Sequence, residues 1–91
     1  MRFIWNDAKA ARNSARHRVS FEEAQTCFYD QFQIAFFDPD HSDNEERELL
    51  IAHSNRGRLL LVSYTQRGST IRLISARKAT RAEARAYAQG I

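Results

Sequence analysis

Cysteine, proline and glycine are scarce in this 91-residue sequence, which has one Cys, one Pro and three Gly. The lone Cys27 cannot form an internal disulfide, and no Cys or His pair has the spacing of a zinc site. No apolar run approaches the ~20 residues of a membrane span, and the first residues lack the apolar core of a signal peptide. We therefore expect a single cytoplasmic domain over residues 1–91 with no membrane segment.

Motifs that hold cofactors are missing as well. The sequence has no Gly-rich phosphate loop, no dinucleotide-binding fingerprint, no serine nucleophile elbow and no HExxH metal motif. We therefore expect neither a cofactor nor a catalytic metal. Hydrophobic residues make up 43% and charged residues 27% of the chain, which is typical of a folded domain and argues against wholesale disorder.

Charge is distributed unevenly along the chain. Residues 1–21 carry five basic residues and one acid, residues 22–48 carry nine acids and one base, and residues 49–91 carry eight bases and one acid. The regional charges of +4, −8 and +7 sum to the net charge of +3. Twelve of the fourteen basic residues are Arg, which can contact phosphate through two hydrogen bonds. This pattern is compatible with a nucleic-acid partner and equally with a solvated surface.

Hydrophobic periodicity and capping residues predict three helices and five strands. Strands are expected at 2–5, 33–37, 46–53, 59–64 and 70–77. Helices are expected from caps at Asn6 or Asp7, Ser20 and Thr80 to about His17, Phe28 and Gly90. Ser20 with Glu23 and Thr80 with Glu83 have the spacing of capping boxes, and Gly57 in the 55–58 turn can adopt the positive φ of a hairpin.

This order, β-α-α-β-β-β-β-α, predicts an α+β fold of two layers. We expect a mainly antiparallel sheet with the helices packed on one face. The other face is then available to solvent or to a partner. In the first helix Ala8, Ala11 and Ala15 are spaced as an inward apolar stripe. Trp5, Phe36 and Phe37 are expected in the core.

The side chains that remain could cut RNA without a metal, because the 2′-OH of RNA is itself a nucleophile. Such a reaction needs a base for the 2′ proton, cations for the charged phosphorane and an acid for the 5′ oxygen. His17 ends the first helix beside two Arg residues, which disfavour its protonated form and suit it to the role of base. It could equally bond the last carbonyls of the helix. His41 and His53 are weaker candidates.

For the other candidate residues, both a chemical role and a structural role remain possible interpretations. Arg77 ends its strand near the start of the last helix, where it could bind phosphate or pair with the acids at 45–48. Strict alternation along 72–77 places Arg72 on the face opposite Arg77. Tyr64 could donate a proton or pack in the core. Arg56, Arg58 and Arg67 lie at hairpin turns, where solvated charge is usual.

The sequence resembles those of the BrnT family of ribonuclease toxins over nearly the whole chain. Five segments carry the resemblance: 3–10, 16–24, 38–47, 57–62 and 71–80. The family's polar motif positions correspond to Lys9, His17, Glu46, Arg47, Arg58, Arg72, Ser75 and Arg77. The chain departs from the family pattern at Arg18 and Ala52, where the family favours Gly, and at Asn6, where it has an acid.

The resemblance implies a RelE-like fold and a metal-independent RNA endonuclease that inhibits translation. It also implies a BrnA-type antitoxin that neutralises the toxin in a hetero-oligomer and supplies the binding to operator DNA. As catalytic residues we predict His17, Glu46, Arg58, Tyr64, Arg72 and Arg77. As RNA-binding residues we predict Lys9, Arg16, Arg47, Arg56 and Lys78. Two alternatives stay open: a non-catalytic module that binds nucleic acid or a partner, and a structural subunit whose sheet face awaits an antitoxin.

Overall fold

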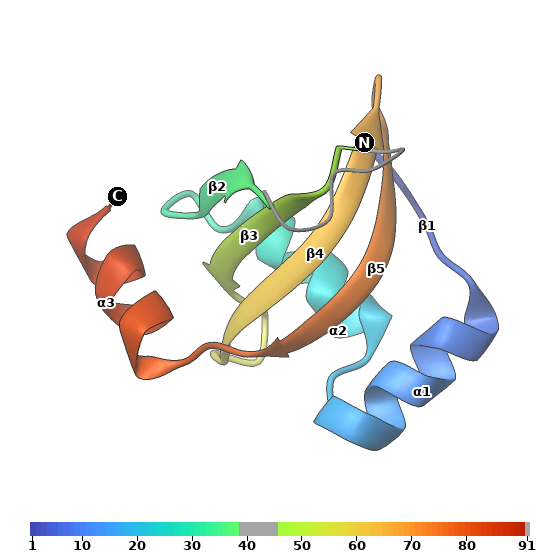
Figure 1. The fold of residues 1–91 in the computed structure, drawn as a ribbon, viewed down its shortest axis with the longest axis horizontal. Coiled ribbons are helices and arrows are strands. Elements are labelled where there is room, and N and C mark those ends of the chain that lie inside the picture. Colours follow the sequence, from blue (N-terminus) through green and yellow to red (C-terminus); the bar gives the residue numbers. More distant parts are fainter. Residues whose placement is uncertain (39–45, 91) are drawn as a thin grey trace.

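Five strands form one mixed sheet in the order β1-β5-β4-β3-β2 (Figure 1). The computed structural model describes residues 1–38 and 46–90, so Pro39, His41 and Glu45 of the predicted loop lie outside the described residues. Strands β2 (Ile34–Phe37), β3 (Glu48–His53), β4 (Leu59–Arg67) and β5 (Thr70–Lys78) pair antiparallel, and β1 (Arg2–Ile4) pairs parallel with β5. The predicted α+β class and mainly antiparallel sheet are confirmed.

Helix α2 (Phe21–Thr26) and the 3-10 turn η1 (Cys27–Tyr29) lie behind the sheet in Figure 1 and close the main core. Phe21, Ala24 and Phe28 are buried, as predicted from their spacing. They pack with strand residues that include Leu50, Ala52, Leu60, Val62, Tyr64, Ile71, Leu73 and Ala76. We call the face of the sheet that carries these residues the core face, and the opposite face the open face.

Helix α1 (Asp7–His17) begins at the predicted cap Asn6, whose side chain accepts from the Lys9 amide. The prediction of its inward face was wrong, because Ala8, Ala11 and Ala15 are all exposed. The helix instead turns Asn13 inward, 7% exposed. An inward polar residue is stable here because its amide group is fully bonded to backbone, as described for the site below.

Helix α3 (Arg81–Gln89) has the predicted capping box at Thr80 and Glu83 and ends at Gly90 with φ 72°. It contacts β3 through Tyr87, whose ring meets His53 edge to face with centroids 5.0 Å apart. His53 alternates with Ala52, a core-face residue, so this contact lies on the open-face side. The prediction that all helices pack on one face is therefore corrected for α3.

A β-bulge changes which β5 residues share a face. Ser75 pairs with Ser63, whereas the next β4 residue, Tyr64, pairs with Leu73, so Ile74 is the extra residue. Leu73 and Ala76 consequently both lie in the core. Arg72 lies on the open face with Ser75 and Arg77, and the prediction of opposite faces for Arg72 and Arg77 was wrong.

Aromatic residues near β2 also depart from prediction. Phe36 and Phe37 are 42% and 65% exposed, because β2 is an edge strand that lies beyond the reach of α2. Phe32, in the turn that precedes β2, is 68% exposed. Trp5 packs against the core as expected, with its ring edge to face against Phe21 at 6.0 Å.

Candidate active site

A groove of about 470 Å³ lies on the open face, where α1 meets β4 and β5. Its lining comes from the last turn of α1, from the residue after β2, from the start of β3 and the residue before it, and from the paired strands β4 and β5. Its lining residues are Arg16, His17, Asp38, Arg47, Leu49, Leu61, Ser63, Ser75, Ala76 and Arg77. Among the described residues, three guanidinium groups, one imidazole and one carboxylate thus line the same groove.

The position of His17 in this groove is fixed by Asn13, one turn earlier on α1. The Asn13 amide nitrogen donates to the carbonyls of Ala76 and Val19, both at 2.9 Å, and its oxygen accepts from the Ala76 N–H at 3.0 Å. This pair of bonds to Ala76 takes the place of a neighbouring strand, since β1 pairs only with residues 70–72 of β5. These bonds hold the end of α1 against β5, and His17 and Ser75 line the same groove.

A second hollow of about 550 Å³ continues from the groove along α1. It shares Arg16, His17 and Ser75 with the groove and adds Lys9 and Arg12. The two spaces together form a cationic surface that we call the basic groove. A phosphodiester chain is a ligand of suitable charge for such a surface.

Arg77 reaches the basic groove from β5 and is held by a carboxylate of α3. Its two terminal nitrogens donate to the two oxygens of Glu83, each at 2.9 Å. Burial alone raises the pKa of Glu83, but the hydrogen bonds from Arg77 and from the Thr80 backbone outweigh it and hold the pKa below the usual value. The carboxylate partner of Arg77 among the described residues is thus Glu83 and not the predicted Glu46 or Glu48, and phosphate binding by Arg77 stays a prediction.

The structure brings together five of the residues predicted from sequence: Lys9, Arg16, His17, Arg47 and Arg77. Other predicted residues lie elsewhere. Arg72 lies on the open face but lines a separate hollow farther along β5. Glu46 and Lys78 are exposed and line neither part of the basic groove.

Arg58 is bound in an ion pair with Glu23. Its Nε donates to Glu23 Oε2 at 2.9 Å, a second nitrogen donates to Oε1, and the same nitrogen donates to the Arg18 carbonyl at 3.0 Å. The Glu23 side chain is 4% exposed and also accepts from Ser54 at 2.6 Å. The predicted capping box is thus half correct: Ser20 accepts from the Glu23 amide, but the Glu23 carboxylate binds Arg58 instead of the Ser20 backbone.

Tyr64 and Arg56 likewise lie away from the basic groove. Tyr64 is 4% exposed on the core face, with its ring edge to face against Phe28 at 4.9 Å. Burial raises the pKa of its hydroxyl to about 12, so Tyr64 does not fit the predicted role of acid. Arg56 is exposed in the 55–58 turn, 3.6 Å from Glu23.

Two residues of the groove were missed in the sequence. Ser63 is the first polar residue after the apolar run 59–62, and this interruption is the available signal. Asp38 lines the groove, whereas the sequence predicts it only as part of a loop. Across the described ranges 1–38 and 46–90, no helix is long and apolar enough to cross a membrane. Within those ranges no three His, Cys, Asp or Glu side chains gather as a metal site would require.

The fold and the basic groove define a class: a small basic α+β protein with a groove lined by cationic side chains on one face of its sheet. Comparison with known proteins makes this specific, because residues 5–83 match the family described as "Ribonuclease toxin, BrnT, of type II toxin-antitoxin system". The chain belongs to this family of ribonuclease toxins, as its sequence motifs suggested.

A solved structure agrees with this assignment. The crystal structure of the ribonuclease toxin BrnT from Brucella abortus is 25% identical in sequence and superposes with a TM-score of 0.64. The alignment covers 89% of this chain and 99% of that one. No curated protein sequence matches the chain significantly.

Proposed function

We propose that the chain is a metal-independent RNA endonuclease with a RelE-like fold that inhibits translation by cutting RNA in the basic groove. The observation that carries this proposal is the convergence of Arg16, Arg47 and Arg77 around His17 in one open groove. The family assignment supports ribonuclease activity, and the groove supplies a location for it.

The proposed chemistry uses the 2′-OH of the substrate as nucleophile. The imidazole of His17 accepts the 2′ proton while O2′ bonds to phosphorus, and Arg16 and Arg47 stabilise the charge that develops on the phosphorane. The bond from phosphorus to O5′ then breaks, and O5′ takes a proton from the ammonium group of Lys9, which lines this surface. The products are a 2′,3′-cyclic phosphate and a 5′-OH end.

The test is cleavage of single-stranded RNA by the purified protein in EDTA. His17→Ala is expected to reduce kcat by about 10²–10⁴-fold, the usual contribution of a general base. Arg85→Ala, at an exposed position of α3 that lines neither part of the basic groove, serves as the folded control. RNA with a 2′-O-methyl group at the cut site should resist cleavage. Equal activity of His17→Ala and wild-type protein would contradict the proposal.

We also propose that a BrnA-type antitoxin binds the edge of β2 and forms the hetero-oligomer of the family. Among the described residues no further strand pairs with this edge, which lies beside the exposed rings of Phe32, Phe36 and Phe37. A type II system implies a protein antitoxin, which supplies the occupant. Co-purification of the neighbouring gene product should be lost in Phe36→Ser/Phe37→Ser and retained in Arg85→Ala, and retention in both would refute this surface. Binding of operator DNA should require the antitoxin.

A further inference from the structure

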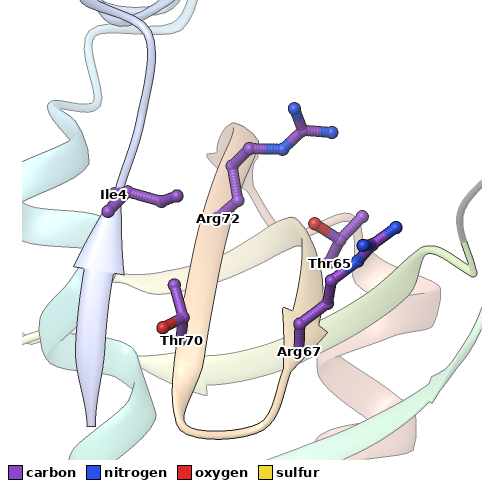
Figure 2. A pocket seen from close by; sticks show the side chains of 5 residues that line it. All are labelled: Ile4, Thr65, Arg67, Thr70 and Arg72. Atoms are coloured by element: carbon purple, nitrogen blue, oxygen red, sulfur yellow. The ribbon is translucent and has the colours of Figure 1, made fainter.

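The open face carries another hollow beyond the basic groove. It measures about 180 Å³ and is lined by Ile4, Thr65, Arg67, Thr70 and Arg72 (Figure 2). A water molecule occupies roughly 30 Å³ in the liquid, so the hollow has room for a group several times larger. We call it the distal hollow. It contains none of the residues that line the basic groove.

The distal hollow is built from three neighbouring strands in register. Arg72 of β5 lies between Ile4 of β1 and Thr65 of β4, and Thr70 is paired with Arg67 at the next open-face position. Figure 2 shows Ile4 directed from β1 toward β5, and the side chains of Arg67 and Arg72 extending away from the sheet on the same side.

The distal hollow and the basic groove lie on the same face of the sheet, as the alternation along β4 and the bulge in β5 show. Thr65 lies two residues after Ser63 in β4, so both face the same side of the sheet. The bulge at Ile74 brings Arg72 to that side together with Ser75. Across the bulge, Ser75 and Arg72 lie opposite Ser63 and Thr65, which are two residues apart in β4, or about 7 Å at 3.3 Å per residue. Extended single-stranded RNA covers such a span in roughly one or two nucleotides.

The chemistry of the lining favours a nucleotide. Among the described residues, the lining of the hollow includes two guanidinium groups and no carboxylate. Two threonine hydroxyls can bond phosphate or ribose oxygens, and Ile4, 38% exposed, offers an apolar surface for a sugar or base.

We propose that the distal hollow is a second RNA-binding subsite, which holds a phosphate and its ribose one or two nucleotides from the bond cut in the basic groove. This inference rests on the proposed ribonuclease function. In it Arg67 and Arg72 are binding residues, and Arg72 does not take part in the chemical step. The subsite gives the enzyme a preference for RNA longer than a dinucleotide.

The test separates binding from cleavage with Arg67→Ala, because Arg67 is exposed at the end of β4 and its loss should not affect folding. Binding is measured by fluorescence anisotropy with a single-stranded 2′-O-methyl RNA, which cannot be cut. Loss of one charge-assisted contact should weaken binding roughly tenfold. On cleavable RNA, KM should rise by a similar factor with kcat unchanged, and cleavage of a dinucleotide should be unaffected.

Two further variants complete the experiment. Thr70→Val should weaken binding less than Arg67→Ala in the same assay, and Arg85→Ala should leave binding unchanged. Equal RNA affinity of Arg67→Ala and wild-type protein would overturn the subsite, and so would an equal loss of dinucleotide cleavage. If the wild-type protein cuts no RNA, the ribonuclease proposal fails, but the binding measurement still decides whether the distal hollow holds RNA.

Discussion

Glu23 shows how a single residue can resemble one feature in sequence and serve another in the fold. Its spacing from Ser20 is that of a capping box, and its amide does complete that cap. Its carboxylate, however, is buried and bonded to Arg58 and Ser54. An unpaired buried carboxylate is strongly unfavourable, so the carboxylate and Arg58 form a structural pair. Because Arg58 is bound in this pair, it is not one of the cations that line the basic groove.

The stability of the protein should therefore depend on acid pH through Glu23. The hydrogen bond from Arg58 lowers the pKa of Glu23 below its ordinary value of 4.5, despite the opposing effect of burial. A depressed pKa means that this stabilisation is complete above the unfolded-state pKa and is lost as pH falls through the folded-state pKa. Urea unfolding at a series of pH values below about 5 should show this loss.

Substitution tests the assignment. At neutral pH, Glu23→Gln should lower the free energy of unfolding by about 2–4 kcal/mol, because it leaves a partly buried Arg58 without its counter-ion. The difference from wild type should shrink as pH falls. Glu22→Gln, at an exposed neighbouring position, is the control and should change stability by less than about 0.5 kcal/mol. A constant difference across the acid range would mean that Glu23 is not the titrating group.

Arg18 is the only residue other than glycine with positive φ among the described residues, at 57°. It ends α1 in the left-handed conformation, and its N–H donates to the Ser14 carbonyl at 2.9 Å. This position corresponds to the glycine of the family motif, which has no Cβ to oppose the conformation. Arg18→Gly should therefore raise the free energy of unfolding by about 0.5–1 kcal/mol, measured by urea denaturation.

At the scale of elements, the attachment of α1 to β5 depends on one amide side chain. Asn13→Ala removes three hydrogen bonds to backbone and leaves the Ala76 N–H and C=O without these partners. We expect a loss of about 2–3 kcal/mol and faster hydrogen exchange at Ala76. Ala11→Ser, on the exposed face of the same helix, should cost less than about 0.5 kcal/mol. Slow exchange at Ala76 in the Asn13→Ala protein would show that other contacts hold α1.

Local signals in the sequence predicted the elements well, whereas their packing required information from distant residues. Caps at Asn6, Ser20 and Thr80 act within one turn, so each helix start was predictable. The inward side of α1 was not, because an asparagine is stable there only through its bonds to Ala76, 63 residues away. The bulge at Ile74 could not be predicted from local sequence either, since it arises from pairing between two strands.

The same distinction applies to the candidate site. Residue type identified Arg16, His17, Arg47 and Arg77, which the structure brings to one groove. Type could not separate them from Arg58, which pairs with a carboxylate that is distant in sequence, or from Tyr64, which faces the core. The face of the sheet on which each of these residues lies follows only from the register of β4 and β5.

For the whole molecule, the uneven charge of the sequence becomes a cationic face. Seven of the fourteen Lys and Arg residues line the basic groove or the distal hollow: Lys9, Arg12, Arg16, Arg47, Arg67, Arg72 and Arg77. Within the part of the chain that the structure describes, Asp38 is the only acid that lines these spaces. The acids of 22–30 lie instead with α2 and η1, toward the other side of the sheet.

This arrangement predicts that RNA affinity falls steeply with salt and that each lining cation contributes to the slope. Binding to single strands loses about 0.7 in the slope of log K against log [salt] for each phosphate neutralised. Arg47→Ala and Arg67→Ala should each reduce the magnitude of this slope by about 0.7, and the double variant by the sum, because the two residues contact different phosphates. Arg85→Ala should leave the slope unchanged, since it lines neither space. A double variant with the slope of either single variant would mean that both residues contact one phosphate, which is incompatible with an RNA strand that spans the open face.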